Sequence, residues 1–369
     1  MKMIIKRVFL CLLAVILIAV IAFVGAYLTR LQTIGSVEKI TDYGDGFDLY
    51  RVDIRYRYDL ERMMKSGFRN NQMVADAILG EAFPLVPIHL ESPEYGCSSF
   101  CITDTEGDVL TGRNYDFERD SSALLVYCAP KNGYRSVGMA ALDHVQIKQI
   151  SSAVDKAFTL PAPFICLDGL NEKGVSIVVL WVDSEPTVQD TEKPDFFTTL
   201  AIRLVLDRAA STQEAVDLLR SYDMFAVSGG DYHFFIADAD GDSRVVEYDC
   251  HSETRELIDT PVRTATNFYQ LYIDKVLPNQ YNSIYGHGRE RYDAIEKILT
   301  DNEGSITKEI AWDALQAAQQ LPKPDSITSN TQWSVVYDNT DLTAEIAIRR
   351  NWNDIASCSL MDYSVFSKP

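Results

Sequence analysis

Residues 95–117, with the sequence YGCSSFCITDTEGDVLTGRNYDF, contain the pattern that decides the fold. Strand-forming runs at 98–104 and 109–114 flank a turn at 106–108, and together they predict a β-hairpin that begins on Cys97. Three prolines precede this hairpin, at positions 84, 87 and 93, and predict an extended connection. We therefore place the boundary of the main folded unit immediately before Cys97.

Strand and helix patterns alternate through the rest of the chain. Further strand-like runs lie at residues 49–56, 123–128, 174–182, 232–237, 244–248, 333–338 and 343–349. Helices are expected at residues 69–83, 197–208, 212–222 and 308–319. Ser211 and Glu214 have the spacing of a capping box for the third of these helices. The order predicts an α+β fold, either two antiparallel sheets covered by helices on their outer faces or helices on one sheet.

Composition restricts the function classes. The chain has 369 residues, 47% hydrophobic and 24% charged, as expected of a folded globular protein. Its formal net charge of -19 predicts a surface that repels phosphate backbones. We therefore expect no binding to nucleic acid.

An uncharged apolar run covers residues 8–28, close to the roughly 20 residues with which a helix crosses the hydrocarbon core. Lys2, Lys6 and Arg7 precede it, which predicts a cytoplasmic N-terminus at residues 1–7 and an extracytoplasmic remainder. The alternative is a secretory signal that is cleaved near residues 24–26. The remainder is exported in both cases, as a single-pass protein of the cell membrane or as a secreted one.

Seven cysteines are spread along the chain, at positions 11, 97, 101, 128, 166, 250 and 358. They show no zinc-binding spacing, and the five histidines do not cluster in sequence, so we expect no metal and no cofactor. The six cysteines beyond the apolar run are also too few for a disulfide scaffold. At least one thiol is therefore available for chemistry.

A thiol attacks as its thiolate and needs a base or a positive charge nearby to react at neutral pH. One source is a histidine close in space, although none lies in a recognisable protease motif. The other source is the α-amine that a cut before Cys97 would free, with a pKa of roughly 7.7 to 8.0. The residues alone leave both sources open.

The opening Gly96-Cys97-Ser98-Ser99-Phe100, with Arg113 and Asp116 following in residues 112–117, resembles the start of the choloylglycine hydrolase and penicillin acylase family. This family also includes acid amidases and acyltransferases. Three later segments are similar to signatures of this family: residues 168–175, Thr266-Asn267, and residues 289–292 around Arg291. Residues 331–337 resemble the terminal hairpin of the family. The resemblance extends from about Tyr95 to Leu360. It implies a four-layer αββα N-terminal-nucleophile hydrolase sandwich at residues 97–369.

The resemblance also implies roles for five residues. Cys97 is the nucleophile, and its own α-amine acts as general base and then general acid. Asp116 orients that amine, and Arg113 supplies positive charge that favours the thiolate. Asn267 donates to the oxyanion, and Arg291 supports the centre or binds a substrate carboxylate.

Simpler interpretations of several positions stay open at this stage. Asn267 is also typical of a turn or a cap, and Arg291 of a solvated helix. Residues 171–174 have the form of a β-turn near the site rather than of a catalytic group. Cys101 shares a strand face with Cys97 and is expected to pack.

Two features depart from the bile-salt hydrolases of this family. Trp181 stands where those enzymes carry an asparagine, which favours an apolar acyl pocket and N-acyl amides other than bile salts. The leader at residues 29–96 is long, as in members that cut themselves into two chains. We therefore predict self-cleavage at Gly96-Cys97, where glycine offers little steric resistance.

The expected function is hydrolysis of linear amide C–N bonds in a small-molecule N-acyl amide, through a thioester on Cys97. One alternative is an acyltransferase that passes the acyl group to an amine. Another is a non-catalytic, membrane-anchored binding protein on the same fold.

Overall fold

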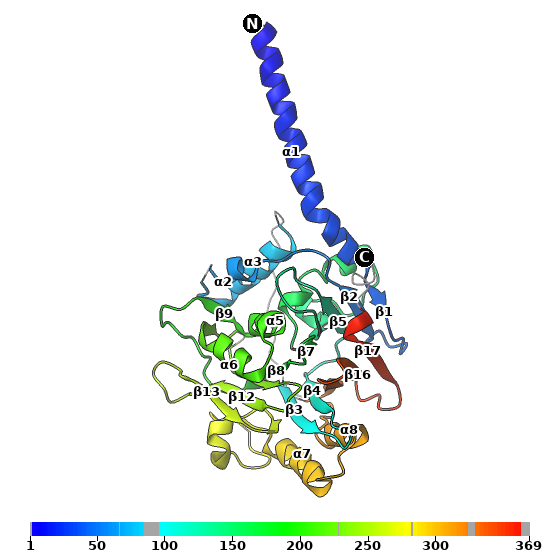
Figure 1. Ribbon diagram of the computed structural model, residues 1–369, viewed down its shortest axis with the longest axis vertical. Helices are drawn as coiled ribbons and strands as arrows, with labels where there is room; N and C mark the ends of the chain where they lie inside the picture. Colours follow the sequence, from blue (N-terminus) through cyan, green and yellow to red (C-terminus); the bar gives the residue numbers. More distant parts are fainter. Residues whose placement is uncertain are drawn as a thin grey trace.

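The computed structural model describes residues 2–65, 67–84, 96–227, 229–281, 283–323 and 329–362 (Figure 1). Pro87, Pro93 and Tyr95 of the predicted connection lie outside these residues. The chain begins with the long helix α1 (Lys2–Gly35), which projects from the rest of the molecule (Figure 1).

The predicted hairpin before residue 117 is present as β3 (Gly96–Thr103) and β4 (Val109–Asp116). Its turn is held by Asp104, whose Oδ1 accepts hydrogen bonds from the backbone N–H groups of residues 106, 107 and 108. Gly107 occupies the left-handed region at φ 97°, which a residue without Cβ adopts without strain. Local turn chemistry therefore sets the hairpin register.

This hairpin lies in a six-stranded antiparallel sheet. The strand order is β14 (Thr264–Ala265), β3, β4, β15 (Thr331–Asp338), β16 (Thr343–Ile348) and β17 (Ile355–Ser359). Its first and fourth strands come from late in the sequence, so residues far from Cys97 along the chain lie beside β3 and β4.

A nine-stranded sheet forms the second layer. Its order is β1 (Glu38–Lys39), β2 (Leu49–Asp53), β5 (Ala123–Cys128), β6 (Ser136–Ala141), β7 (Asp168–Asn171), β8 (Ser176–Val182), β11 (Asp231–Ala237), β12 (Ser243–Tyr248) and β13 (Leu257–Pro261). Two short strands, β9 (Asp195–Phe197) and β10 (Asp223–Phe225), pair separately and in parallel.

The expectation that both main sheets are antiparallel is wrong for one pair. β2 runs parallel to β5, because the chain leaves β2, forms two helices and the whole β3–β4 hairpin, and only then returns to the nine-stranded sheet. The leader at residues 29–96 thus contributes a buried strand to the sheet.

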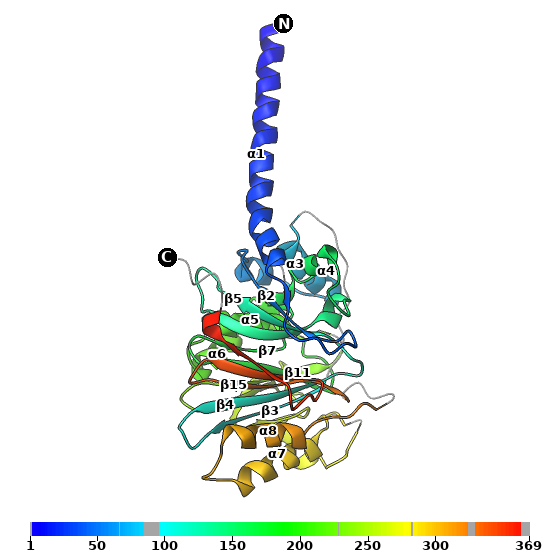
Figure 2. The same ribbon diagram turned by 90° about the vertical axis from the view of Figure 1, so that its right-hand side faces the viewer.

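Helices cover the outer face of each sheet, which gives four layers (Figure 2). α5 (Thr198–Arg208) and α6 (Thr212–Arg220) pack on the nine-stranded sheet, while α7 (Arg289–Asp301) and α8 (Lys308–Ala317) pack on the six-stranded sheet. The sheets face each other through β3 and β8. The two-sheet alternative was therefore the correct one.

Alternation along β3 separates two cores. Phe100 and Ile102 point outward and pack with Ile295 of α7 and Trp312 of α8. Cys97 and Cys101 point inward, into the large core between the sheets. The predicted packing role of Cys101 agrees with its 5% exposure.

The described residues form further helical elements. They are α2 (Leu60–Met64), α3 (Asn71–Ala82), α4 (Ala153–Ala157) and the 3₁₀ turns Leu142–Val145, Ala162–Phe164, Gln270–Lys275 and Leu360–Asp362. The capping box predicted for α6 is half formed: Ser211 accepts from Glu214 N, whereas the Glu214 carboxylate accepts from Ala210 N. Helix α7 was not predicted from the sequence.

The apolar run lies within α1. Among the described helices, one is long and apolar enough to cross a bilayer: Cys11–Gly35, with a mean hydropathy of 2.9 and no buried residues in its most apolar window. A signal sequence near the N-terminus has the same properties. The end of α1 is different, because Arg30 and Thr33 are buried against the folded unit.

Candidate active site

Cys97 lies at the start of β3 with its side chain between the two sheets. In the β3–β4 register, Cys97 pairs with Tyr115 and Ser99 pairs with Arg113. Directly opposed residues of an antiparallel pair point to the same face, so the Cys97 thiol and the Arg113 guanidinium share the inner face. Both side chains are fully buried.

Asp116 points to the opposite, outer face of the same sheet. It pairs with Gly96, one residue out of phase with Tyr115. The Asp116 carboxylate accepts a hydrogen bond from Thr331 Oγ1 at 2.7 Å and lies 3.5 Å from Arg291 Nη1. Arg113 and Asp116 are therefore not an ion pair with each other.

A β-bulge brings Thr331 to Asp116. Thr331 pairs with Asp116, and Trp333 pairs with Tyr115, so two steps along β15 match one step along β4. In a regular strand without the bulge, Thr331 and Trp333 are two positions apart and would face the same side. The bulge instead directs Thr331 outward to Asp116 and Trp333 inward, where its ring stacks on Tyr115.

Asn267 and Arg291 hold the peptide groups of Cys97. The backbone N–H of Cys97 donates to Asn267 Oδ1 at 2.9 Å, and Arg291 Nη1 donates to the carbonyl oxygen of Cys97 at 2.6 Å. Arg291 Nη2 also donates to Asn267 Oδ1 at 2.6 Å, and Asn267 Nδ2 donates to the carbonyl of Trp181 at 2.7 Å. The partner of the Cys97 nitrogen is thus Asn267 rather than Asp116.

Arg291 reaches Cys97 from the first turn of α7. It is 3% exposed, so the interpretation as a solvated helix residue is wrong. The preceding Gly288 adopts φ 92°, and a Cβ there would lie 2.4 Å from Arg291 Nη2. Glycine at 288 therefore makes room for the guanidinium, and both terminal nitrogens are already engaged by protein oxygens.

Burial controls the charge of the central groups. It raises the pKa of the Cys97 thiol to about 12, against the lowering effect of Arg113 and the smaller one of Arg291. Burial also raises the pKa of Asp116, which Arg291 and the Thr331 hydrogen bond oppose. The thiol is accordingly neutral at pH 7, and the two guanidinium groups favour its ionised form.

Sequence reasoning missed Asp168 as part of the centre. Asp168 Oδ2 lies 2.5 Å from Arg113 Nε, and both side chains are fully buried. The same carboxylate accepts hydrogen bonds from Trp333 Nε1, at 3.2 Å, and from the Tyr337 hydroxyl. Asp168 had been noted only as the first residue of the 168–175 signature; its burial beside Arg113 depends on how the two sheets pack.

Trp181 lies on β8. The side-chain amide of Asn267 connects it to Cys97, because this amide donates to the Trp181 carbonyl and accepts from the Cys97 N–H. Its indole is 5% exposed and lies 6.2 Å from the His287 ring, edge to face. The indole also crosses the backbone of Gly230, where a Cβ would lie 1.9 Å from Nε1. Nε1 has no hydrogen-bond acceptor among the described residues.

Among the described residues, no hydrogen bond or ion pair connects Cys97 with a histidine. His144 Nε2 lies 3.3 Å from the Tyr115 hydroxyl, and His233 Nε2 lies 2.8 Å from the Thr266 carbonyl. Burial lowers the pKa of His287 to about 3, so this ring is neutral at pH 7. The contacts give no support to a histidine base.

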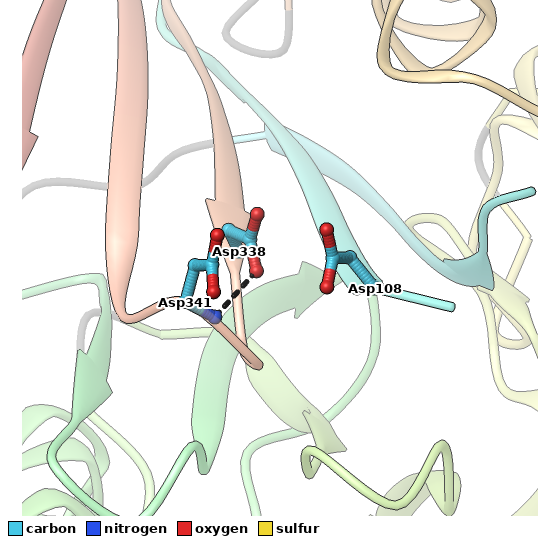
Figure 3. Close-up of side chains that lie close together, drawn as sticks. All are labelled: Asp108, Asp338 and Asp341. Atoms are coloured by element: carbon cyan, nitrogen blue, oxygen red, sulfur yellow. Dashed lines mark hydrogen bonds between the residues drawn. The ribbon is translucent and has the colours of Figure 1, made fainter. Parts of the chain in front are cut away.

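One acidic cluster has the spacing of metal ligands in the described part of the chain: Asp108, Asp338 and Asp341 (Figure 3). It lies at the far end of β4 and β15 from Asp116 and Thr331. Asp338 already accepts from the N–H of Asp341 and pairs with Lys308 at 3.7 Å. The cluster is thus separate from the Cys97 centre.

A family model described as acyl-coenzyme A:6-aminopenicillanic acid acyl-transferase matches residues 103–353, more than half of the chain. The chain belongs to this family. The matched range of this chain contains Arg113, Asp116, Asn267 and Arg291, and Cys97 lies before its first residue. The predicted membership in the group of choloylglycine hydrolases and penicillin V acylases is confirmed.

Solved structures share the fold of this acyltransferase-family member. Penicillin V acylase from Agrobacterium tumefaciens has a TM-score of 0.52 and 19% identity, over 72% of this chain and 87% of that one. A mutant conjugated bile acid hydrolase from Clostridium perfringens has a TM-score of 0.53 and 16% identity, over 71% and 92%. No curated protein sequence matches. The chain is thus similar in fold to amide hydrolases.

Proposed function

We propose that the protein hydrolyses linear N-acyl amides through a thioester on Cys97, after cutting itself between Gly96 and Cys97. The observation that carries this proposal is the set of side chains that hydrogen-bond to the Cys97 peptide groups. Asn267 holds the nitrogen that a cut would free, Arg291 holds the carbonyl, and Arg113 shares a face with the thiol. Each group has a defined use in the two steps below.

In self-cleavage the Cys97 sulfur attacks the carbonyl carbon of Gly96. The C–N bond breaks, the nitrogen takes up a proton, and a thioester links Gly96 to the sulfur. Water then hydrolyses the thioester and leaves a carboxylate on Gly96 and a free amine and thiol on Cys97. Arg113 favours this step because its positive charge stabilises the attacking thiolate.

In amide hydrolysis the free α-amine accepts the thiol proton as the sulfur attacks the substrate carbonyl. The resulting ammonium donates the proton to the leaving nitrogen, and the acyl group stays on sulfur. Water, deprotonated by the same amine, releases the acid. Asn267 would turn its Nδ2 from Trp181 to the oxyanion, and Asp116 would accept from the new ammonium.

The decisive experiment is intact-mass analysis and N-terminal sequencing of the purified chain. We expect a new N-terminus at Cys97 and no cut in Cys97→Ala. Cys101→Ala is the matched control, because Cys101 is a second buried thiol on the same face of β3 and should leave the cut intact. A chain that stays whole and does not react with a thiol-directed acyl probe would instead be a non-catalytic binding protein.

For the substrate we propose an apolar acyl group, long-chain or aromatic. The support is Trp181, whose backbone carbonyl accepts a hydrogen bond from Asn267 and whose large buried indole lies edge to face with the uncharged His287. A panel of N-acyl amino acids, N-acyl ethanolamines, penicillin V and conjugated bile salts tests this preference. Rapid hydrolysis of the bile salts alone would show that the indole does not select the acyl chain.

Acyl transfer to an amine is a second candidate, because the matching family model is described as an acyl-transferase. Both reactions share the thioester and differ in the acceptor that reaches it. Added amine nucleophiles separate them: a transferase gives the new amide as its main product, whereas a hydrolase gives the free acid.

We further propose that the leader stays bound after the cut and holds the enzyme at the membrane. β2 pairs with β5 from Leu49 to Asp53, and Arg30 of α1 donates to the carbonyls of Ala82 and Glu81 at the end of α3. Strand pairing and buried hydrogen bonds of this kind do not depend on the bond before Cys97.

Size-exclusion chromatography in detergent tests the retained leader. Both fragments should elute together, and the leader should begin at residue 1. A leader that begins near residue 27 would identify the apolar run as a cleaved signal. Separate elution would show that the leader is a removable prosegment.

A further inference from the structure

Two buried arginine–aspartate pairs of the described residues involve the nine-stranded sheet or a helix packed on it. Arg203 and Asp207 of α5 pair at 2.6 Å, away from Cys97, and Arg203 also donates to Ser136 Oγ. Arg113 and Asp168 pair at 2.5 Å across the space between the sheets. Burying two charges is costly unless hydrogen bonds and geometry compensate, so the partners of the second pair are informative.

Asp168 is fixed by two donors from the neighbouring sheet. Trp333 Nε1 donates to its Oδ2 and the Tyr337 hydroxyl donates to its Oδ1. Both donors lie on β15, next to β4, which carries Arg113. The carboxylate therefore has a fixed position relative to the strand of Arg113.

Arg113 is held at one side only. Its Nε is against Asp168, and its guanidinium carbon lies 5.1 Å from the Tyr115 ring and 5.5 Å from the Trp333 ring. None of its three nitrogens has a partner of hydrogen-bond geometry among the described residues, so Nε is engaged by the ion pair alone and Nη1 and Nη2 by no acceptor. Buried donors without acceptors require an explanation, and an anion that the guanidinium meets during function is one.

We propose that Asp168 is a positioning residue, which fixes Arg113 through Nε so that its two terminal nitrogens stay available to the Cys97 thiolate. This inference deepens the proposed function and rests on it. Asp168 contacts neither the thiol nor a substrate. It acts by orienting the charge that both self-cleavage and amide attack require.

Two effects of Asp168 on the thiol have opposite signs, and this makes the role testable. The Asp168 charge by itself opposes ionisation of Cys97, whereas the Arg113 charge favours it more strongly. If Asp168 acted only through its charge, its removal would ease ionisation. If it positions Arg113, its removal releases the guanidinium and makes ionisation harder.

The test is Asp168→Asn in the full chain, with self-cleavage followed by intact mass from neutral to alkaline pH. In the cleaved chain, alkylation of Cys97 by iodoacetamide is followed by peptide mass. We expect cleavage to slow by about tenfold at neutral pH and both profiles to move up by about one pH unit. An unchanged profile, or a shift to lower pH, overturns the proposal.

Asp207→Asn is the matched control, because it breaks the buried Arg203–Asp207 pair and should leave both profiles unchanged. If Asp168→Asn does not fold, Tyr337→Phe removes one hydrogen bond to Asp168 and keeps the ion pair. It should shift the profiles in the same direction by less, and a folded Tyr337→Phe with the original profile overturns the role. If the unmodified chain never cuts itself, the proposed function is wrong. If it cuts itself and the Asp168 and Tyr337 variants keep the original pH profiles, only the positioning role of Asp168 is wrong.

Discussion

At the scale of single residues, Cys97 is held by its peptide groups. Asn267 and Arg291 bind its nitrogen and carbonyl, and no hydrogen bond of the described residues involves its sulfur. We therefore expect the reactivity of Cys97 to depend on ionisation of its thiol, which burial suppresses and Arg113 favours.

Self-cleavage should accelerate with pH. Because burial raises the pKa of Cys97 to about 12, the thiolate fraction and the rate should rise about tenfold per pH unit between neutral and moderately alkaline pH. Time courses by gel electrophoresis in a series of buffers measure this slope. A rate independent of pH would mean that thiol ionisation does not limit the cut.

Gly230→Ala should displace the Trp181 indole, because the new Cβ would lie 1.9 Å from Nε1. Overpacking of this kind costs about 1 to 3 kcal/mol in the free energy of unfolding, and we expect a changed acyl preference as well. Gly80→Ala in α3 is the control, since a Cβ there meets no atom within 4 Å. It should be neutral or stabilise by up to about 1 kcal/mol, as measured by denaturant unfolding.

At the scale of elements, the bulge in β15 and the first turn of α7 build the centre. The bulge sends Thr331 to Asp116 and Trp333 to the inner face. Helix α7 brings Arg291 to the carbonyl of Cys97. Of these two features, only the first turn of α7 supplies a side chain to the proposed reaction, namely Arg291. Both features nevertheless decide which face of the sheet each group of the centre occupies.

Thr331→Val should remove the Thr331 donor from Asp116 and leave a buried carboxylate oxygen without its partner. We expect a loss of about 1 to 3 kcal/mol in the free energy of unfolding and slower self-cleavage. Thr331→Ser keeps the hydroxyl and should retain most of both properties. Equal behaviour of the two variants would indicate that the methyl group, rather than the hydrogen bond, matters here.

At the scale of the whole molecule, the leader and the late strands both belong to the main sheets. β2 of the leader belongs to the nine-stranded sheet, and β15 pairs with β4 in the six-stranded sheet. Buried titratable groups are distributed through these layers, so stability as well as chemistry should depend on pH.

Burial lowers the pKa of His144 from 6.5 to about 4. A depressed folded-state pKa stabilises the fold above the unfolded value, and this contribution is lost as pH falls from 6.5 toward 4. The loss should approach about 3 kcal/mol. Thermal unfolding across this range should show a weaker acid dependence in His144→Gln than in the unmodified chain, and equal acid dependence of the two would contradict this role of His144.

The sequence by itself determined the local elements and the nucleophile candidate. The β3–β4 hairpin, β5, α5 and α8 follow from short-range apolar spacing and turn residues, which act within a few positions of the chain. The family motif around Cys97, Arg113 and Asp116 is equally local. These features needed no knowledge of how the sheets pack.

Only the tertiary structure decided which of these groups meet. Asn267 and Arg291 reach Cys97 from 170 and 194 residues away, because β14 and α7 lie beside β3. The parallel β2–β5 pair, the bulge at Gln332 and the Arg113–Asp168 ion pair likewise depend on register between distant strands. Such pairings are set by burial of whole sheet faces, which no short window of sequence encodes.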